Sequence, residues 1–154
     1  IVGKKKIMKN FDKIFFSTTF GGETLSLAAA LATIKYLQKE DVINKIKKFS
    51  NKLIRDIKKI IYNLNLNKTF VIEGVWWRPA FGVCKGVDKL YLEVLRKNLI
   101  KNKLLIGNSF NFCYAHTNIN TYKEIITRIE TSLKQTSKTK LGIYNYVKKN
   151  SVRS

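Results

Sequence analysis

The residues best suited to chemistry lie in a glycine-containing turn that precedes an alanine-rich segment. Residues 17–30 read Ser-Thr-Thr-Phe-Gly-Gly-Glu-Thr-Leu-Ser-Leu-Ala-Ala-Ala. Amide groups at a helix N-terminus lack partners within the helix and favour negative charge, and glycine lets a ligand approach the backbone. Thr18 and Thr19 add hydroxyl donors. The pattern predicts a phosphate-binding turn that includes Gly21; the alternative is a tight connection that binds no ligand.

Arg78 is a candidate ligand for a substrate carboxylate. It follows Trp76 and Trp77 in the sequence, and a guanidinium group binds a carboxylate through two parallel hydrogen bonds. The alternative is a surface arginine that stacks on a tryptophan. His116 is the only histidine, and it is a candidate for acid–base chemistry because imidazole exchanges protons near neutral pH.

The cysteines indicate neither a disulfide framework nor a metal centre. Cys84 and Cys113 are the only two in the chain, and they are too few and too far apart for a zinc site or a set of disulfides. We expect reduced, inert thiols that lie in strands. No metal is predicted.

The formal net charge of +20 predicts unspecific attraction to nucleic acids and anionic membranes. The lysines are spread along the chain, and no helix-turn-helix, zinc-finger or aromatic-basic strand motif is present to read a base sequence. We therefore predict no specific nucleic-acid partner. The sequence also has no apolar run long enough to span a bilayer and no secretory leader, so we expect a cytoplasmic protein without a membrane partner. The alternative is a stand-alone basic binding protein that contacts RNA or anionic surfaces.

The pattern of apolar residues predicts an α+β fold with a small sheet and helices packed on one face. At 154 residues and 45% hydrophobic content, the chain is long enough to bury a core. Asp41 is expected to cap the second long helix, Pro79 to interrupt the strand region, and Thr121 with Glu124 to cap the last helix, unless that helix begins a turn earlier at Thr117. The expected helices are 4–10, 23–39, 41–64, one from 88 and one from 121, and the expected strands are 69–77, 80–84, 104–106 and 110–114.

Two separated segments form a longer pattern. The first begins with Ile-Val-Gly-Lys-Lys-Lys-Ile-Met at 1–8 and continues through the glycine turn into the alanine-rich helix. The second is Gly-Asn-Ser-Phe-Asn-Phe-Cys-Tyr-Ala-His-Thr at 107–117. Together they resemble class III pyridoxal-phosphate-dependent aminotransferases, especially the glutamate-1-semialdehyde 2,1-aminomutase-like branch. The resemblance covers about residues 1 to 135 and corresponds to the C-terminal third of these enzymes.

The resemblance implies the C-terminal part of a fold-type I transferase, which combines the α+β region with the end of an α/β domain. It assigns 1–40 to the end of the large cofactor-binding domain and the inter-domain helix, 41–135 to the small C-terminal domain, and 136–154 to a basic tail. It also implies a homodimer, pyridoxal 5'-phosphate as the cofactor and a small amino-group donor or acceptor as the substrate.

The resemblance assigns roles to few residues. Thr19 matches the threonine that reaches the cofactor phosphate of the neighbouring subunit, with Thr18 and Gly21 in the same turn. Glu23 and Thr24 replace the usual Asn-Pro or His-Pro, so a carboxylate either opposes the phosphate or caps the helix. The family's histidine at the position of His116 ends a strand and organises the turn into the last helix, which favours a structural role over chemistry.

The lysine that forms a Schiff base with the cofactor has no counterpart in this chain. In the family it precedes the segment that matches residues 1–8, and we expect Lys4, Lys5 and Lys6 to begin a solvated helix. The chain is therefore expected to be a C-terminal fragment that contains no catalytic residue and is inactive alone. The substrate, and the choice between transamination and a 1,2-amino shift, depend mainly on the missing part.

Overall fold

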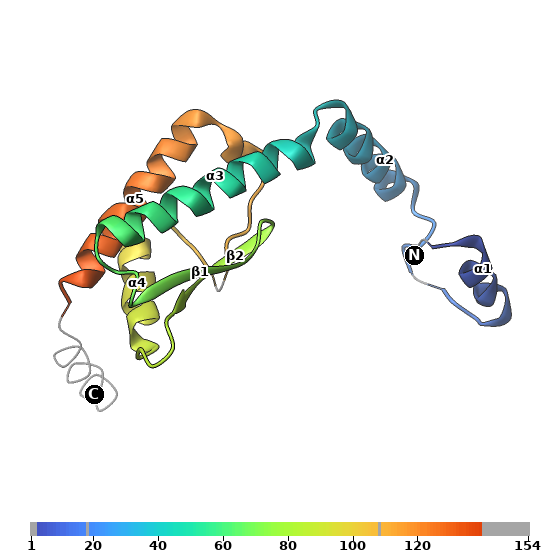
Figure 1. Ribbon diagram of the computed structural model, residues 1–154. Coiled ribbons are helices and arrows are strands. Elements are labelled where there is room, and N and C mark those ends of the chain that lie inside the picture. The colour runs from blue at the N-terminus through green and yellow to red at the C-terminus, as the bar shows by residue number, and fades with distance from the viewer. Residues whose placement is uncertain (1–2, 18, 108, 140–154) are drawn as a thin grey trace, which may run out of the picture. The chain divides into compact units, whose positions relative to one another are not determined.

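The computed structural model describes residues 3–17, 19–107 and 109–139 (Figure 1). The chain divides into two compact units, Ile1–Glu40 and Asp41–Ser154, and each is described by itself. Their assignment to a large and a small domain remains a prediction. No described helix is long and apolar enough to cross a membrane. Most of the expected basic tail lies outside the described residues.

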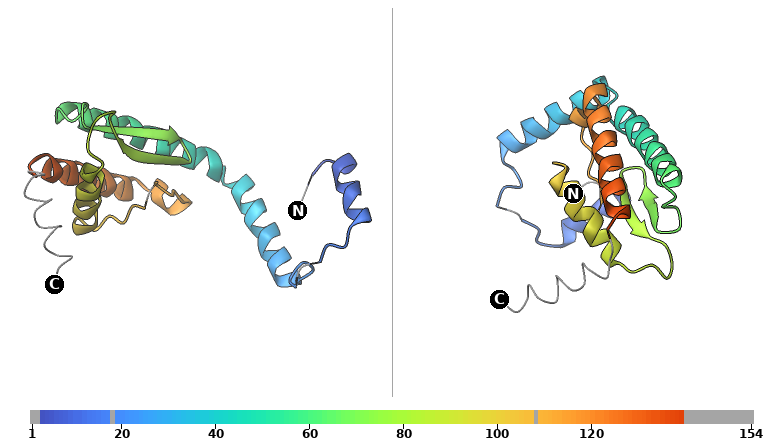
Figure 2. Two further views of the ribbon diagram at one scale, coloured as in Figure 1. Left: turned by 90° about the horizontal axis from the view of Figure 1, so that it is seen from below. Right: turned by 90° about the vertical axis from the view of Figure 1, so that its left-hand side faces the viewer.

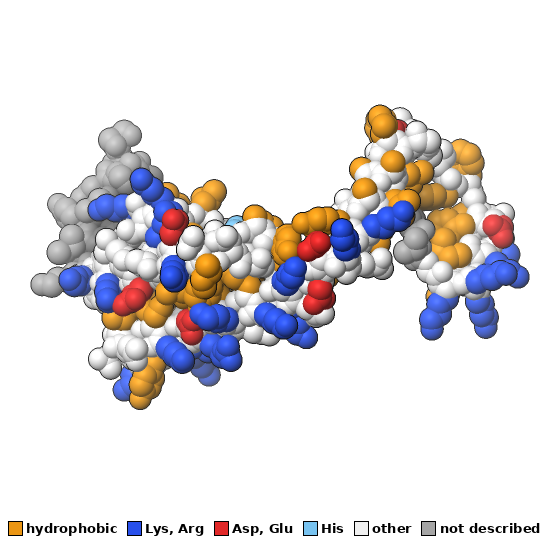
Figure 3. Space-filling view, turned by 90° about the horizontal axis from the view of Figure 1, so that it is seen from above, with side chains coloured by type: hydrophobic (Ala, Val, Ile, Leu, Met, Phe, Trp, Pro, Cys, Tyr) orange, Lys and Arg blue, Asp and Glu red, His pale blue; other side chains and the backbone are white. Residues whose placement is uncertain are grey.

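The first unit consists of short helical segments and one longer helix without buried residues. Helix α1 spans Lys5–Met8, the 3-10 helix η1 spans Lys9–Lys13, and helix α2 spans Thr24–Lys39. Every described residue of these elements is exposed or half-buried, and Leu25 of α2 is 80% exposed. Apolar side chains gather visibly on this unit (Figure 3). Because helices in proteins owe most of their stability to the packing of an apolar face, this unit has little internal stabilisation.

Helix α3, Val42–Asn63, begins the second unit and provides one wall of its core. Its buried apolar residues recur every three to four positions, which places them on one face, while lysines occupy the exposed face. Asp41 is the N-cap residue of α3, as predicted, but the expected side-chain cap is wrong: Asp41 has a φ of 49°, and its side chain makes no capping bond to the backbone. Its carboxylate instead accepts a hydrogen bond from the Asn44 side-chain amide at 2.7 Å.

Strands β1, Phe70–Val75, and β2, Arg78–Val83, form an antiparallel hairpin. The expectation that Pro79 interrupts the extended chain is wrong, because this residue lies inside β2 and pairs with Gly74. A two-stranded sheet tolerates proline because each strand is an edge. The Pro79 carbonyl accepts a hydrogen bond from the Phe110 N–H at 2.8 Å, which ties the later chain to the hairpin.

The chain after the hairpin forms two helices and a coil segment. Helix α4 spans Leu90–Lys101, the 3-10 helix η2 spans Tyr114–Thr117, and helix α5 spans Ile119–Ser137. Within the described part of the chain, the hairpin is the whole sheet. The strands expected at 104–106 and 110–114 are therefore wrong: these residues contribute side chains such as Phe110, which is 5% exposed, to the core without joining a ladder.

Helix α5 begins two residues earlier than the expected Thr121. Asn118 is its N-cap, and the Asn118 side chain accepts a hydrogen bond from the Asn120 N–H at 2.8 Å. The Thr121–Glu124 capping box is thus wrong, because both residues lie within the helix. The alternative start at Thr117 is also two residues from Ile119, the observed first residue, and Thr117 belongs to η2.

The core of the second unit lies where the hairpin meets the three helices (Figure 2). Helix α3 packs against β1 and α5, and α4 packs against β2 and α5. On β1, Phe70 and Ile72 are buried while Glu73 is exposed, so one face of the hairpin faces the helices. This confirms the predicted α+β arrangement. The buried cluster comprises Phe49, Leu53, Ile57, Ile61, Leu66, Phe70, Ile72, Leu95, Leu99, Phe110, Tyr122, Ile129 and Leu133.

A polar cluster joins α4 to α5 beside this core. The Asn102 side-chain amide donates to the Ser132 hydroxyl and to the Gln135 carbonyl, each at 2.9 Å, and to the Asn98 backbone carbonyl at 2.8 Å. The Asn98 side-chain amide donates to the Thr136 hydroxyl at 2.9 Å. Buried polar groups stabilise a fold only when they are paired. Among the described residues, every buried side-chain nitrogen and oxygen has a partner.

Candidate functional site

The predicted phosphate turn lies in the first unit and is open to solvent. Thr19 to Gly22 form the turn, and both Thr19 and Gly21 are exposed. The Glu23 N–H donates to the Phe20 carbonyl at 3.2 Å, which closes the turn before α2. Thr18, the third predicted contact, lies outside the described residues.

Glu23 occupies the N-terminus of α2, where the sequence predicts that a phosphate binds. Its carboxylate accepts hydrogen bonds from the Leu25 N–H, at 2.8 Å, and from the Ser26 N–H. Bonds from the hydroxyl and amide of Ser26, followed by the Leu25 amide, hold the pKa of Glu23 below its ordinary value. Of the two roles left open for this carboxylate, the structure shows the helix cap.

The start of α2 is therefore not an open anion-binding site. Two amide donors at the start of α2 are already bonded to Glu23, so they do not form an anion cradle. The exposed Thr19 hydroxyl and the glycine backbone can still contact a phosphate group that is bound mainly by other residues. The roles of Thr19 and Gly21 remain predictions.

Arg78 lies at the start of β2, in the second unit, with an exposed side chain. Its Nε donates to the Ser109 hydroxyl at 3.1 Å. Trp76 and Trp77 contact each other edge to face, with ring centroids 5.3 Å apart. The structure thus pairs Arg78 with a serine 31 residues away, a contact that sequence proximity does not reveal. The role of Arg78 toward a substrate remains a prediction.

His116 organises the short helix that precedes α5. Its Nδ1 accepts a hydrogen bond from the Cys113 N–H at 3.0 Å, and the Thr117 hydroxyl donates to the Tyr114 carbonyl at 2.8 Å. The structure thus shows the turn-organising role that the resemblance favoured, whereas the expected place of His116 at the end of a strand is wrong, because it lies in η2. The expectation that both cysteines lie in strands is wrong: Cys113 is the exposed N-cap of η2, and Cys84 is half-buried immediately after β2. Both thiols are free.

A charged cluster between α3 and α5 was not anticipated from the sequence. The Tyr122 hydroxyl donates to an Asp56 carboxylate oxygen, and the Lys52 ammonium lies 3.0 Å from that oxygen. The same ammonium lies 3.6 Å from the centroid of the Tyr122 ring. These bonds, led by that of Tyr122, lower the pKa of Asp56. Lys52 and Asp56 are four residues apart on a helix, which was the available signal, but only tertiary packing brings Tyr122 to them.

Comparison with known proteins finds relatives among enzymes that use pyridoxal phosphate. No family model matches the chain. It is 27% identical to a glutamate-1-semialdehyde 2,1-aminomutase of Saccharolobus islandicus over 71% of the chain and 28% of that protein. It is 25% identical to a 3-aminobutyryl-CoA aminotransferase of Cloacimonas acidaminovorans over 76% of the chain and 29% of that protein. The chain therefore spans less than a third of the length of these relatives.

A solved structure shows the same fold. The PLP internal aldimine form of the FumI protein of Sphingopyxis sp. MTA144 matches with a TM-score of 0.77 and 12% sequence identity, over 90% of this chain and 34% of that one. The fold is thus that of the C-terminal portion of a fold-type I enzyme. Together with the sequence relatives, it confirms the resemblance to class III aminotransferases over part of their length.

Proposed function

We propose that this chain is the C-terminal portion of a pyridoxal-phosphate-dependent class III aminotransferase or aminomutase. The observation that carries the proposal is the fold match over 90% of the chain, to which the sequence relatives add independent support. In this proposal, residues 41–135 form the small domain that closes over the substrate, and residues 1–40 belong to the large domain. Pyridoxal phosphate, when bound, supplies the electron sink that carries the amino group.

The first unit contributes a contact to the cofactor of a neighbouring subunit. Thr19 is exposed in its turn, so its hydroxyl is available to donate to a phosphate oxygen. Helix α2 has no buried residue of its own, and apolar surface of this kind is covered when it packs on other protein. Both observations support a homodimer in which this unit lies against protein rather than solvent.

Arg78 holds the carboxylate of the substrate in the same proposal. The hydrogen bond from its Nε to Ser109 fixes one edge of the guanidinium group. The Nη groups on the other edge then bind a carboxylate in the paired geometry that arginine favours. The substrate is a small amino-group donor or acceptor.

The chain alone is not expected to transaminate, because none of its residues corresponds to the lysine that holds the cofactor in the resembled enzymes. Purified chain mixed with pyridoxal phosphate and amino acids is expected to show neither amino transfer nor the visible absorption of lysine-bound cofactor. Turnover by this chain alone would overturn that part of the proposal. Activity is expected only from a longer protein that adds the large domain.

The phosphate contact is tested by Thr19→Ala in a dimeric enzyme that contains this chain. Loss of a hydrogen bond to a charged group costs about 1.5–3 kcal/mol, so the dissociation constant of the cofactor is expected to rise roughly 10- to 100-fold. Thr33→Ala is the matched control, because the Thr33 hydroxyl is already bonded to the Ala29 carbonyl within α2. Equal cofactor affinity in both variants would show that Thr19 makes no such contact.

A further inference from the structure

The second unit contains an open groove between α3 and the start of α5, with a volume of about 350 Å³. Lys45, Lys48 and Lys52 line it from α3, and Phe49 and Tyr122 form its floor. We call it the lysine groove. The α3 residues are spaced by three, four and seven positions, which places them on one face of the helix. Neither the proposed cofactor contact nor the proposed substrate contact uses this groove.

The floor of the lysine groove consists of two packed aromatic rings. Phe49 and Tyr122 are each 7% exposed, and their rings meet edge to face with centroids 5.8 Å apart. At the rim, Ile119 is 60% exposed, and the Thr117 hydroxyl is held by the Tyr114 carbonyl. A floor of packed aromatic rings beside an exposed apolar side chain suits the flat apolar part of a ligand.

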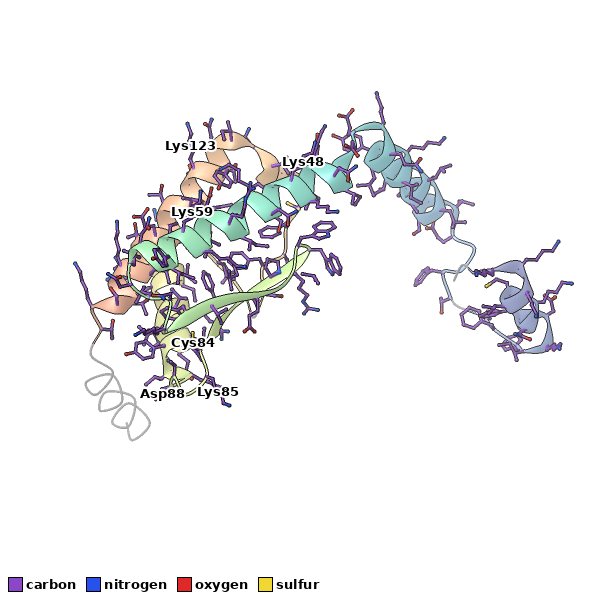
Figure 4. All side chains as sticks on the ribbon, in the orientation of Figure 1. Lys48, Lys59, Cys84, Lys85, Asp88 and Lys123 are labelled. Atoms are coloured by element: carbon purple, nitrogen blue, oxygen red, sulfur yellow. The ribbon has the colours of Figure 1, made fainter. Side chains whose placement is uncertain are left out.

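The wall of the groove is positively charged and partly fixed in position. The Lys45 ammonium donates to the Tyr114 hydroxyl at 2.9 Å, and the Lys52 ammonium is held by Asp56 and the Tyr122 ring. Lys48 lies between them on α3, with an exposed side chain (Figure 4). No acidic side chain lines the groove, but the Asp56 carboxylate, 3.0 Å from the Lys52 ammonium, offsets part of that charge, so Lys45 and Lys48 supply most of the positive charge. The groove therefore offers several ammonium groups along one side of an aromatic floor.

We propose that the lysine groove binds a small organic anion whose phosphate or carboxylate group is attached to a flat apolar body. The body packs on Phe49 and Tyr122, and the anionic group lies among the ammonium groups of Lys45, Lys48 and Lys52. The volume of the groove falls within the few hundred Å³ typical of small-molecule sites. The net charge of +20 attracts anions to the whole surface, whereas the aromatic floor selects those with an apolar body.

The test is a calorimetric titration of the full 154-residue chain with each of four compounds: phenyl phosphate, benzoate, inorganic phosphate and benzyl alcohol. Phenyl phosphate or benzoate is expected to bind about tenfold more tightly than inorganic phosphate or benzyl alcohol, because only the first pair combines charge with an apolar ring. The stronger of the two distinguishes a phosphate from a carboxylate headgroup. Equal affinity for inorganic phosphate and phenyl phosphate would overturn the proposal.

A pair of charge-matched variants separates the groove from general electrostatic attraction. Lys48→Gln is expected to weaken phenyl phosphate binding about fivefold, which corresponds to the loss of one nearby ammonium group. Lys123→Gln removes the same charge from an exposed position on α5 that does not line the groove, and it is expected to change binding less than twofold. Equal weakening by the two variants would mean that the anion binds the basic surface at large, and it would refute the groove as the site.

Discussion

Removal of the Asn102 side chain is expected to destabilise the second unit more than substitution of a partly exposed residue usually does. Its amide makes three hydrogen bonds, to the Ser132 hydroxyl, the Gln135 carbonyl and the Asn98 backbone carbonyl. The amide has only two hydrogens to share among these three acceptors, and each hydrogen bond contributes about 1 kcal/mol net. With the acceptors left without a donor, Asn102→Ala is expected to cost about 2–3 kcal/mol. That is a large share of the roughly 5–10 kcal/mol that holds a unit of this size folded.

This decrease in the free energy of unfolding is measured by urea unfolding, with the fluorescence of Trp76 and Trp77 as the signal. With a denaturant slope of roughly 1–1.5 kcal/mol per molar urea, the unfolding midpoint of Asn102→Ala is expected to fall by about 2 M. Asn51→Ala is the control, because Asn51 is exposed in the middle of α3, and its change is expected within about 0.5 kcal/mol. Similar midpoints for both variants would refute the reasoning that these hydrogen bonds join α4 to α5.

The hairpin, the charged cluster and the glycine turn give three further predictions. Gly74→Ala is expected to lower the stability measured by thermal unfolding by about 1–3 kcal/mol, because Gly74 has a φ of +95° and an added Cβ would lie 2.8 Å from the Arg78 carbonyl oxygen. Gly86→Ala is the control and should cost less, because Gly86 has a φ of +84° but open space around it. The lowered pKa of Asp56 means that its ionised form stabilises the fold; this stabilisation is fully present above the pKa of Asp56 in the unfolded chain and is lost as the pH falls through its pKa in the folded chain. Tyr122→Phe should therefore raise the pKa of Asp56 in an NMR titration, and the variant should be less destabilised relative to the unmodified chain at acidic pH than at neutral pH. An unchanged pKa of Asp56 would contradict this reasoning. Glu23→Gln keeps an acceptor at the start of α2 but removes the charge, so cofactor affinity measured in a dimeric enzyme that contains this chain should rise about threefold, and a fall would mean that the carboxylate assists the phosphate contact.

The helices were predictable because their signals are local. The stripe of apolar residues from Val42 to Leu64 predicts a helix over 41–64, one residue longer at each end than the observed α3. The exact ends depended on competing caps: Asn118, and not Thr121, starts α5, and the Asp41 carboxylate bonds the Asn44 side chain instead of the backbone. Residues of similar chemistry lie close together in these segments, so the choice among them is made by the surrounding structure.

The sheet and the contacts of the candidate sites were less predictable because they depend on residues far apart in the chain. The segment around Phe110 is apolar enough for a strand, but burial of the side chain and one bond to the Pro79 carbonyl satisfy it without a ladder. The partners of Arg78 and Asp56 are 31 and 66 residues away. The sequence pointed to Thr19 and Arg78 as site residues by resemblance and by side-chain chemistry, and neither signal specified their neighbours.

The exposed apolar side chains of the first unit are expected to make association of this chain depend on salt. Leu25 and Phe15 are 80% and 97% exposed, and side chains of this kind attract one another between molecules. The net charge of +20 opposes such contacts at low ionic strength. At about 0.1 M salt, repulsion between exposed charges more than about 10 Å apart is largely screened. Added salt is therefore expected to weaken the repulsion between copies of this chain and to favour their association through the exposed apolar side chains of the first unit.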